Sequence, residues 1–198
     1  MAREIELKFK VASFDSVRAA LDAAGAAHLQ TVIQTDRYYD TADHSLRGGD
    51  IGLRLRVMRH VEGPQDADER PQLTYKGPAE DHVRAKIRRE LQTFVDDAAA
   101  IEALLAALGL IVTMTLQKRR STWRLDGCLV ELDSLPLLGD FVEIEAPDET
   151  ALETVERKLA LAGPPIQRHY IDLAESACQK LNIDCRTITF KDCDKCRG

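Results

Sequence analysis

The chain has 198 residues, of which 44% are hydrophobic and 30% charged, a balance typical of a globular protein with its own core. Its formal net charge of −6 excludes the basic surface that nucleic acids and anionic membranes require. No stretch approaches the roughly 20 apolar residues of a membrane span and no apolar targeting core follows Met1, so we expect a cytoplasmic protein without nucleic-acid or membrane partners.

The first half of the chain is predicted to form a strand, a helix and then further strands. Residues 4–11 alternate charged and apolar side chains, as a half-buried strand does. A helix is expected from Ser13, which can cap it, to Gly25, which can end it. Further strands are expected at residues 29–39, 50–60 and 71–77, with a loop over residues 62–70.

The second half repeats this order. It begins with a strand at residues 86–95 and a helix that runs from Asp96 to Gly109. Strands at 111–124, 128–133 and 140–146 follow, then a helix from Asp148 to Gly163 and a helical segment near 170–182. The shared order indicates two related lobes, whose sheets could close into one barrel without exposed edges.

Charged and aliphatic side chains occupy opposite faces of strand after strand. The helices need the aliphatic faces to pack on, so we expect the charged faces to line a wide, wet barrel interior. The alternative is a sheet whose charged face meets solvent through cross-strand ion pairs. Arginines and carboxylates at i,i+2 spacing on many strands favour the interior, where basic groups would hold phosphate oxygens and carboxylates would hold hard cations.

At this point the motifs resemble a known family. Glu4-Ile5-Glu6-Leu7-Lys8 is similar to the Glu-x-Glu-x-Lys signature of the CYTH superfamily, which groups class IV adenylyl cyclases, thiamine triphosphatases and inorganic triphosphatases. The resemblance covers about residues 3–175 in the family's order, through Tyr38-Tyr39-Asp40-Thr41, Leu53-Arg54-Leu55-Arg56, Leu73-Thr74-Tyr75-Lys76-Gly77-Pro78, Arg88-Arg89-Glu90, Lys118-Arg119-Arg120, Val130-Glu131-Leu132-Asp133 and Leu138-Gly139-Asp140-Phe141-Val142-Glu143-Ile144-Glu145.

The resemblance implies an α+β fold: a closed antiparallel eight-stranded β-barrel, called a triphosphate tunnel, with two pseudo-repeated halves, a charged interior and helices outside. The CYTH domain would span residues 1–183, and residues 184–198 would form a flexible tail. The triphosphate would be bound by Lys8, Arg54, Arg56, Lys76, Arg88, Lys118 and Arg120. Mg²⁺ or Mn²⁺ would be bound by Glu4, Glu6, Asp133, Glu143 and Glu145, with Glu90 and Glu131 as secondary candidates. Lys86 would also face the interior, where it could form an ion pair without contacting the ligand.

By the same resemblance, Glu4, Glu6 and Lys8 would be catalytic, and the substrate would be ATP, thiamine triphosphate or inorganic tripolyphosphate. Two chemistries stay open: attack by water, which gives a triphosphatase, and attack by a ribose 3′-hydroxyl, which gives cyclic AMP and pyrophosphate. The alternative from another class is a non-catalytic polyphosphate- or nucleotide-binding module, which could dispense with the carboxylates. The sequence is compatible with a monomer and with a homodimer.

Several residues outside these motifs also have two interpretations. Cys178, Cys185, Cys193 and Cys196 could hold zinc, although a tail with free thiols is the simpler interpretation. His169 and Tyr170 could close the mouth of the tunnel or anchor a helix by packing. Trp123 could stack on a base, but its place in a predicted strand favours ordinary packing.

Overall fold

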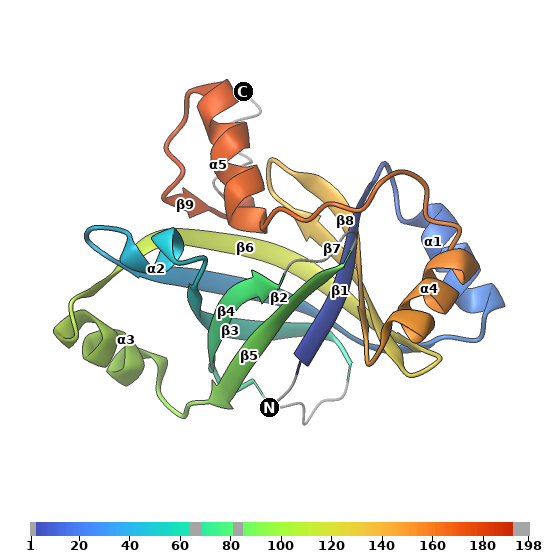
Figure 1. Cartoon of the computed structure of the whole chain (residues 1–198), viewed down its shortest axis with the longest axis horizontal. Helices are drawn as coiled ribbons and strands as arrows, with labels where there is room; N and C mark the ends of the chain where they lie inside the picture. Colours follow the sequence, from blue (N-terminus) through green and yellow to red (C-terminus); the bar gives the residue numbers. More distant parts are fainter. Residues whose placement is uncertain (1–2, 64–68, 81–84, 192–198) are drawn as a thin grey trace.

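We describe a computed structural model of the chain over residues 3–63, 69–80 and 85–191, without the side chains of Arg3, Glu4 and Lys86 (Figure 1). The strands are β1 (Arg3–Val11), β2 (Ala27–Thr41), β3 (Gly52–Glu62), β4 (Gln72–Glu80), β5 (Lys86–Phe94), β6 (Leu110–Leu125), β7 (Cys128–Leu135), β8 (Gly139–Ala146) and β9 (Thr187–Ile188). The helices are α1 (Asp15–Ala23), α2 (Ser45–Gly48), α3 (Ala98–Ala107), α4 (Glu149–Lys158) and α5 (Tyr170–Leu181).

Strands β1 to β8 form a closed antiparallel ring. Their order is β2-β3-β4-β5-β1-β8-β7-β6, and the long strands β2 and β6 pair with each other from Ala27 opposite Arg124 to Thr41 opposite Leu110. This pairing closes the ring and confirms the predicted eight-stranded barrel. The halves β1-α1-β2 and β5-α3-β6 follow the same order of strand, helix and long strand.

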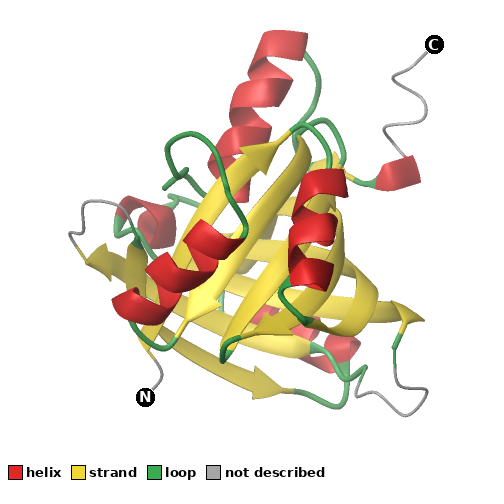
Figure 2. Cartoon of the chain, turned by 90° about the vertical axis from the view of Figure 1, so that its right-hand side faces the viewer, coloured by secondary structure: helices red, strands yellow, loops and turns green. Residues whose placement is uncertain are grey.

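The aliphatic faces of the strands point outward, as the alternation predicts. Helices α1 and α4 cover one side of the barrel, on the right in Figure 1 and over the front of the sheet in Figure 2. Val17, Leu21 and Val155 from these helices pack with Leu7 and Ile144 from the strands. Burying a side chain of this size contributes roughly 1.5–3 kcal/mol, so this packing holds the charged faces inward.

Helix α5 lies apart from α1 and α4, above β6 and next to β9 (Figure 1). Its Tyr170 and Cys178 join Met114, Leu116 and Phe141 in a second apolar cluster. A disulfide links Cys178 to Cys185, whose Cα atoms lie 5.8 Å apart. The prediction of free thiols is therefore wrong for Cys178 and Cys185, and neither sulfur is a zinc-binding thiolate. Cys193 and Cys196 lie outside the described residues.

Two elements were not predicted. Helix α2 begins where the Asp40 carboxylate accepts hydrogen bonds from the backbone N–H groups of Leu46 (2.9 Å) and Arg47 (3.1 Å). Strand β9 pairs in parallel with Thr115 and Leu116 of β6, within the segment 184–191 that the sequence assigned to the tail. Strand β9 depends on a partner distant in sequence, whereas the Asp40 contacts of α2 are local and support a helix of only four residues.

Helix α4 ends earlier than expected, at Lys158 rather than near Gly163. Ala160 adopts a left-handed conformation with φ of 47°, which stops the helix before Gly163 is reached. Within the described part of the chain, none of the helices has both the length and the apolar character needed to cross a bilayer.

Candidate functional site

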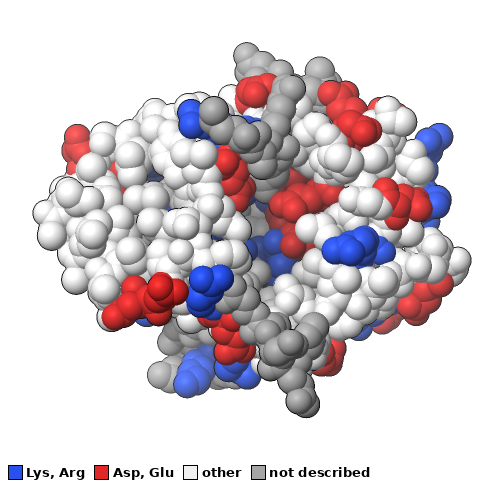
Figure 3. Space-filling view, turned by 90° about the horizontal axis from the view of Figure 1, so that it is seen from below, with Lys and Arg blue, Asp and Glu red and all other residues white. Residues whose placement is uncertain are grey.

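A cavity of about 850 Å³ lies inside the barrel, and all eight strands of the ring contribute to its lining. Figure 3 looks into the molecule from below and shows a hollow with acidic side chains on one wall and basic ones at its depth. The charged faces therefore line an interior, and the alternative of a solvent-facing charged sheet is wrong.

Most of the sequence-predicted site residues come together in this cavity. Its lining includes Glu6, Lys8, Arg54, Arg56, Lys76, Arg88, Glu90, Lys118, Arg120, Glu131, Glu143 and Glu145. Asp133 lies just behind this lining with 0% of its surface exposed. The side chains of Glu4 and Lys86 fall outside the described residues.

Asp133 is held by three neighbours. Arg120 donates from Nε to Oδ1 (2.6 Å) and from Nη2 to Oδ2 (2.5 Å). Lys118 Nζ (2.9 Å) and the Tyr170 hydroxyl (3.1 Å) also donate to Oδ2. Both carboxylate oxygens are thus occupied by protein donors, which makes Asp133 an anchor for the two basic groups.

Two glutamates extend this network. Glu143 accepts from Arg120 Nη2 (2.5 Å) and pairs with Lys8 Nζ (3.0 Å), and Glu131 pairs with Arg120 Nη1. Lys8 Nζ also lies 4.3 Å from the centre of the Tyr170 ring, a cation–π contact. Tyr170 therefore both anchors α5 and contacts the charged lining.

Burial and neighbouring charges shift the pKa values of this network in opposite directions. Burial alone would raise the pKa of Asp133, but the charges of Arg120 and Lys118 lower it below its usual range. Burial raises the pKa of Glu131 against the opposing charge of Arg120. Burial and the Arg120 charge together lower the pKa of Lys118.

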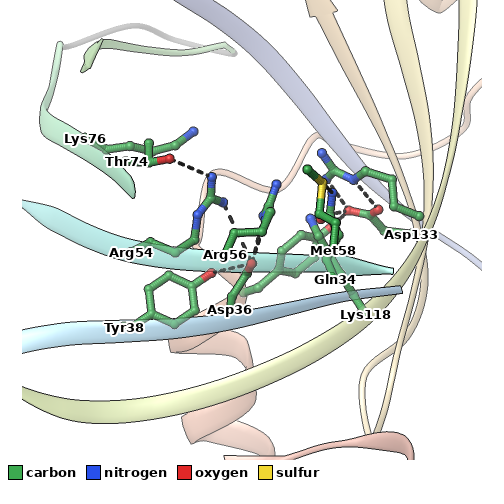
Figure 4. Close-up of polar contacts among 12 residues, drawn as sticks. Gln34, Asp36, Tyr38, Arg54, Arg56, Met58, Thr74, Lys76, Lys118 and Asp133 are labelled. Carbon is green, nitrogen blue, oxygen red and sulfur yellow. Dashed lines mark hydrogen bonds and ion pairs between the residues drawn. The ribbon is translucent and has the colours of Figure 1, made fainter. Parts of the chain in front are cut away.

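A second anchor, Asp36 on β2, was missed by the sequence analysis. Its carboxylate, 1% exposed, accepts from Arg56 Nε (2.6 Å) and Nη2 (2.7 Å), while Arg54 Nη1 lies 3.8 Å away and the Tyr38 hydroxyl donates at 3.4 Å (Figure 4). Burial would raise the pKa of Asp36, but the two arginines hold it well below its usual range. Burial and the Asp36 charge raise the pKa of Tyr38 to about 12.

A sequence signal for Asp36 exists but is weak. Asp36 and Tyr38 are two residues apart, so they share a face of the strand, and Asp36 lies opposite Arg56 in the β2–β3 register. The preceding residues Val32 and Ile33 are both apolar, which hides the alternation that marks the other strands.

The remaining predicted residues form pairs nearer to α2 and α5. Lys76 Nζ lies 2.9 Å from Glu90 Oε2. Arg88 Nη2 lies 3.1 Å from His169 Nε2 and 3.4 Å from Asp50 Oδ2. His169 is the N-cap residue of α5 and also lines the cavity, so it both borders the helix and faces the interior.

Trp123, in contrast, follows the packing interpretation. Its ring lies 4.9 Å from the ring of His28 and its indole N–H donates to Ser121 Oγ (3.1 Å). It packs against the apolar cluster beneath α1 and α4, on the outer side of the barrel.

The carboxylates supply the right donor atoms for a hard divalent cation. Glu6 and Glu145 are direct cross-strand partners that line the cavity, and Glu143 and Glu131 form a second such pair. As the side chains stand, no group of three or more His, Cys, Asp or Glu within the described ranges is close enough to hold a metal. Glu6, Glu143 and Glu145 have the donor chemistry that Mg²⁺ or Mn²⁺ prefers, but Glu143 would have to exchange its contacts with Lys8 and Arg120 for the metal. Both oxygens of Asp133 likewise accept from protein donors.

Fold and site together define a class of protein: a closed antiparallel barrel whose interior carries a dense set of basic and acidic side chains. Within this class the chain belongs to the CYTH family, because the model of the CYTH domain matches residues 2–169.

Known proteins agree with this placement. Adenylate cyclase CyaB of Aeromonas hydrophila is 29% identical over 159 residues, which are 79% of this chain and 76% of that protein. Among solved structures, a Pyrococcus horikoshii protein has a TM-score of 0.68 and 28% identity, with 86% of this chain and 98% of that one covered. HpAC1 from Hippeastrum, a protein with a dominant triphosphatase activity, shares the fold with a TM-score of 0.67 and 18% identity, over 87% and 95% of the two chains.

Proposed function

We propose that this protein is a divalent-metal-dependent enzyme that breaks a phosphoanhydride bond of a triphosphate bound inside the barrel. The observation that carries the proposal is the convergence on one cavity of basic side chains from five strands and of glutamates from the neighbouring strands β1, β8 and β7. The basic groups are Lys8, Arg54, Arg56, Lys76, Arg88, Lys118 and Arg120, and the lining glutamates on β1, β7 and β8 are Glu6, Glu131, Glu143 and Glu145.

The arginines suit a polyphosphate because their orientation is fixed before the ligand arrives. Arg56 uses Nε and Nη2 to bind Asp36, which leaves Nη1 as a donor on a rigid guanidinium plane. Asp133 fixes Arg120 and Lys118 in the same way. Little side-chain entropy is then lost when phosphate oxygens bind, so affinity per hydrogen bond is higher.

The carboxylate wall suits the metal. Glu6 and Glu145, with Glu143 beside them, would hold Mg²⁺ or Mn²⁺, and by family resemblance Glu4 would join them. The bound ion would neutralise negative charge on the phosphates as the anhydride bond breaks. Lys8, whose pKa is raised because the charges of Glu143 and Glu6 outweigh its burial, stays protonated and holds a phosphate oxygen beside this wall.

The same cavity serves two reactions that differ only in the nucleophile. The name of the Aeromonas relative favours cyclisation of ATP, and the activity of HpAC1 favours hydrolysis. A non-catalytic binding module would not need the carboxylates of Glu6, Glu143 and Glu145. We therefore favour an enzyme over a module that only binds polyphosphate or nucleotide. A cytoplasmic location remains a prediction that accompanies this proposal.

Product analysis tests the proposal directly. The purified protein is incubated with ATP, thiamine triphosphate or tripolyphosphate, each with Mg²⁺, Mn²⁺ or EDTA. Cyclic AMP with pyrophosphate identifies a cyclase, and orthophosphate identifies a triphosphatase. Turnover that persists in EDTA contradicts the metal dependence, and binding without turnover supports the module instead.

Two variants test the residues assigned to the metal and to the phosphates. Glu6→Ala should lower kcat/KM about 100-fold with either metal, because the metal loses a ligand. Lys76→Ala should weaken tripolyphosphate binding about tenfold by removing a charge-assisted contact. Arg59→Ala is the control, since it removes one positive charge from an exposed position on the same sheet and should change neither quantity. Unchanged behaviour of either cavity variant contradicts its assignment.

A further inference from the structure

Along strands β2 and β3 the lining of the cavity changes from charged to uncharged side chains. Asp36 and Arg56 face each other across these strands, and two residues further along the same face Gln34 lies opposite Met58. From there the lining on β2, β3, β4 and β5 is uncharged, a surface that we call the uncharged wall: Gln30, Gln34, Met58, Gln72 and Phe94. On β6 the lining stays charged, because Arg120 and Arg124 lie on either side of Thr122. The carboxylates Glu6 and Glu145 stand on the other side of the ring, on β1 and β8.

The opposite end of the cavity is charged. Lys76 and Glu90 lie there as an ion pair, and Arg88 contacts His169 and Asp50. A substrate with a polyphosphate at one end and an uncharged group at the other would therefore lie with its uncharged group toward Gln34 and Met58. An inorganic polyphosphate would leave the uncharged wall without a partner.

Gln34 is the unusual member of this wall. It is only 4% exposed, yet its Oε1 has no hydrogen-bond partner among the described residues. Its Nε2 reaches only the Met58 sulfur, at 3.9 Å, and a thioether is a weak acceptor. Buried side-chain amides are usually hydrogen-bonded, and the last torsion of glutamine turns easily, so this amide is suited to bind a ligand.

Gln34 lies where the basic groups of the cavity meet the uncharged wall, the place where a base joined to a bound triphosphate would be. In the register it lies opposite Lys118 on β6, and Figure 4 shows it beside Met58 and Lys118. Two residues along a strand span about 6.6 Å, so a group at Gln34 is separated from a phosphate on Arg56 by a distance comparable to a sugar. Glutamine amides pair with base edges, and thioethers contact aromatic faces favourably.

We propose that Gln34 is a specificity-determining residue: its amide hydrogen-bonds the base of a nucleoside triphosphate, and the uncharged wall selects such a substrate over inorganic triphosphate. This inference rests on the proposed function, because it assumes that the polyphosphate occupies the basic part of the cavity.

The test compares ATP with tripolyphosphate in three proteins: wild type, Gln34→Leu and Gln34→Asn. Dissociation constants are measured in EDTA, and kcat/KM values with Mn²⁺. Leucine removes both polar atoms at similar volume, and asparagine withdraws the amide by one methylene. We expect each variant to lower the preference for ATP over tripolyphosphate about tenfold, since a lost hydrogen bond to the base affects only ATP.

Gln117→Leu is the matched control. Gln117 lies on β6 but on the outer side, where it bonds Thr35 Oγ1 and the Phe190 N–H, so its loss should leave the ATP preference unchanged. Thermal melting confirms that each variant is folded. Removal of an unpaired buried amide should not destabilise the protein, which makes Gln34→Leu a safe substitution.

The outcomes separate this inference from the proposed function. A preference for tripolyphosphate in the wild type, or an ATP preference that both Gln34 variants retain within twofold, overturns the inference while turnover upholds the enzyme. Absence of turnover, with an ATP preference in binding that Gln34→Leu and Gln34→Asn abolish, contradicts the enzyme and supports the role of Gln34.

Discussion

Asp36 and Asp133 each hold an arginine by paired hydrogen bonds, Arg56 in one case and Arg120 in the other. The alternation of charge predicted the basic residues and placed them inside the barrel. Its assignment of Asp133 to a metal stays a prediction, but the sequence could not show that four donor atoms of Arg120, Lys118 and Tyr170 contact this carboxylate. It omitted Asp36 because two adjacent apolar residues interrupt the pattern on β2. The sequence therefore predicted which charged residues face the interior, but it could not predict which of them pair with each other.

The first residue-scale prediction concerns Asp36→Ala. This change leaves the buried Arg56 guanidinium without its counter-charge, and breaking a buried pair in this way costs about 3 kcal/mol. Urea denaturation should show this loss in the free energy of unfolding. Asp184→Ala, which breaks an exposed ion pair with Arg186, is the control and should leave stability unchanged. An Asp36→Ala variant with the same free energy of unfolding as the wild type would show that Arg56 finds another partner.

A second residue-scale prediction concerns acid pH. The folded-state pKa of Asp36 is lowered, so its contribution to stability is complete above the ordinary aspartate pKa of about 3.9 and is lost as pH falls below it. The free energy of unfolding of the wild type should therefore decrease between about pH 4 and pH 2. The free energy of unfolding of Asp36→Asn should decrease less steeply in that window. Asp133 and Glu143, whose pKa values are also lowered, still make it depend on pH. Equal slopes in chemical denaturation would contradict the lowered pKa.

At the scale of elements, the strands and long helices follow from local patterns, and the short elements do not. Strand alternation and capping residues such as Asp97, which accepts from the Ala99 and Ala100 N–H groups, are visible in the sequence. Helix α2 has only four residues, and its Arg47 pairs with Asp172 and Glu175 of α5, while β9 pairs with β6. A local pattern cannot predict contacts that such distant segments supply.

The element-scale prediction concerns the disulfide between Cys178 and Cys185. It ties the C-terminal half of α5 to the segment that leads into β9. Reduction should lower the free energy of unfolding by about 2 kcal/mol, the value expected for a short closed loop. The measurement is urea denaturation with and without a thiol reductant.

A double Cys178→Ala, Cys185→Ala variant is the control: it buries no new polar group in the apolar cluster, should have about the stability of the reduced protein and should show no further response to reductant. Equal stability of oxidised and reduced wild type would mean that apolar packing alone holds α5.

For the whole molecule, closure of the ring determines which sheet edges meet water. Strand β6 pairs with β2 along its full length, but β7 covers its other side only from Arg119 onward. The two residues of β9 occupy part of what remains, at Thr115 and Leu116. The segment 187–188 therefore shields backbone groups that would otherwise be available to another strand.

This small strand gives the barrel protection against self-association. A chain that ends at residue 183 should keep the eight-stranded ring but expose unpaired backbone on β6, and exposed edges recruit strands from other molecules. Sedimentation at increasing concentration should detect oligomers of the shortened chain where the full chain stays in one state. A shortened chain that behaves like the full chain would show that the β6 edge resists pairing by itself.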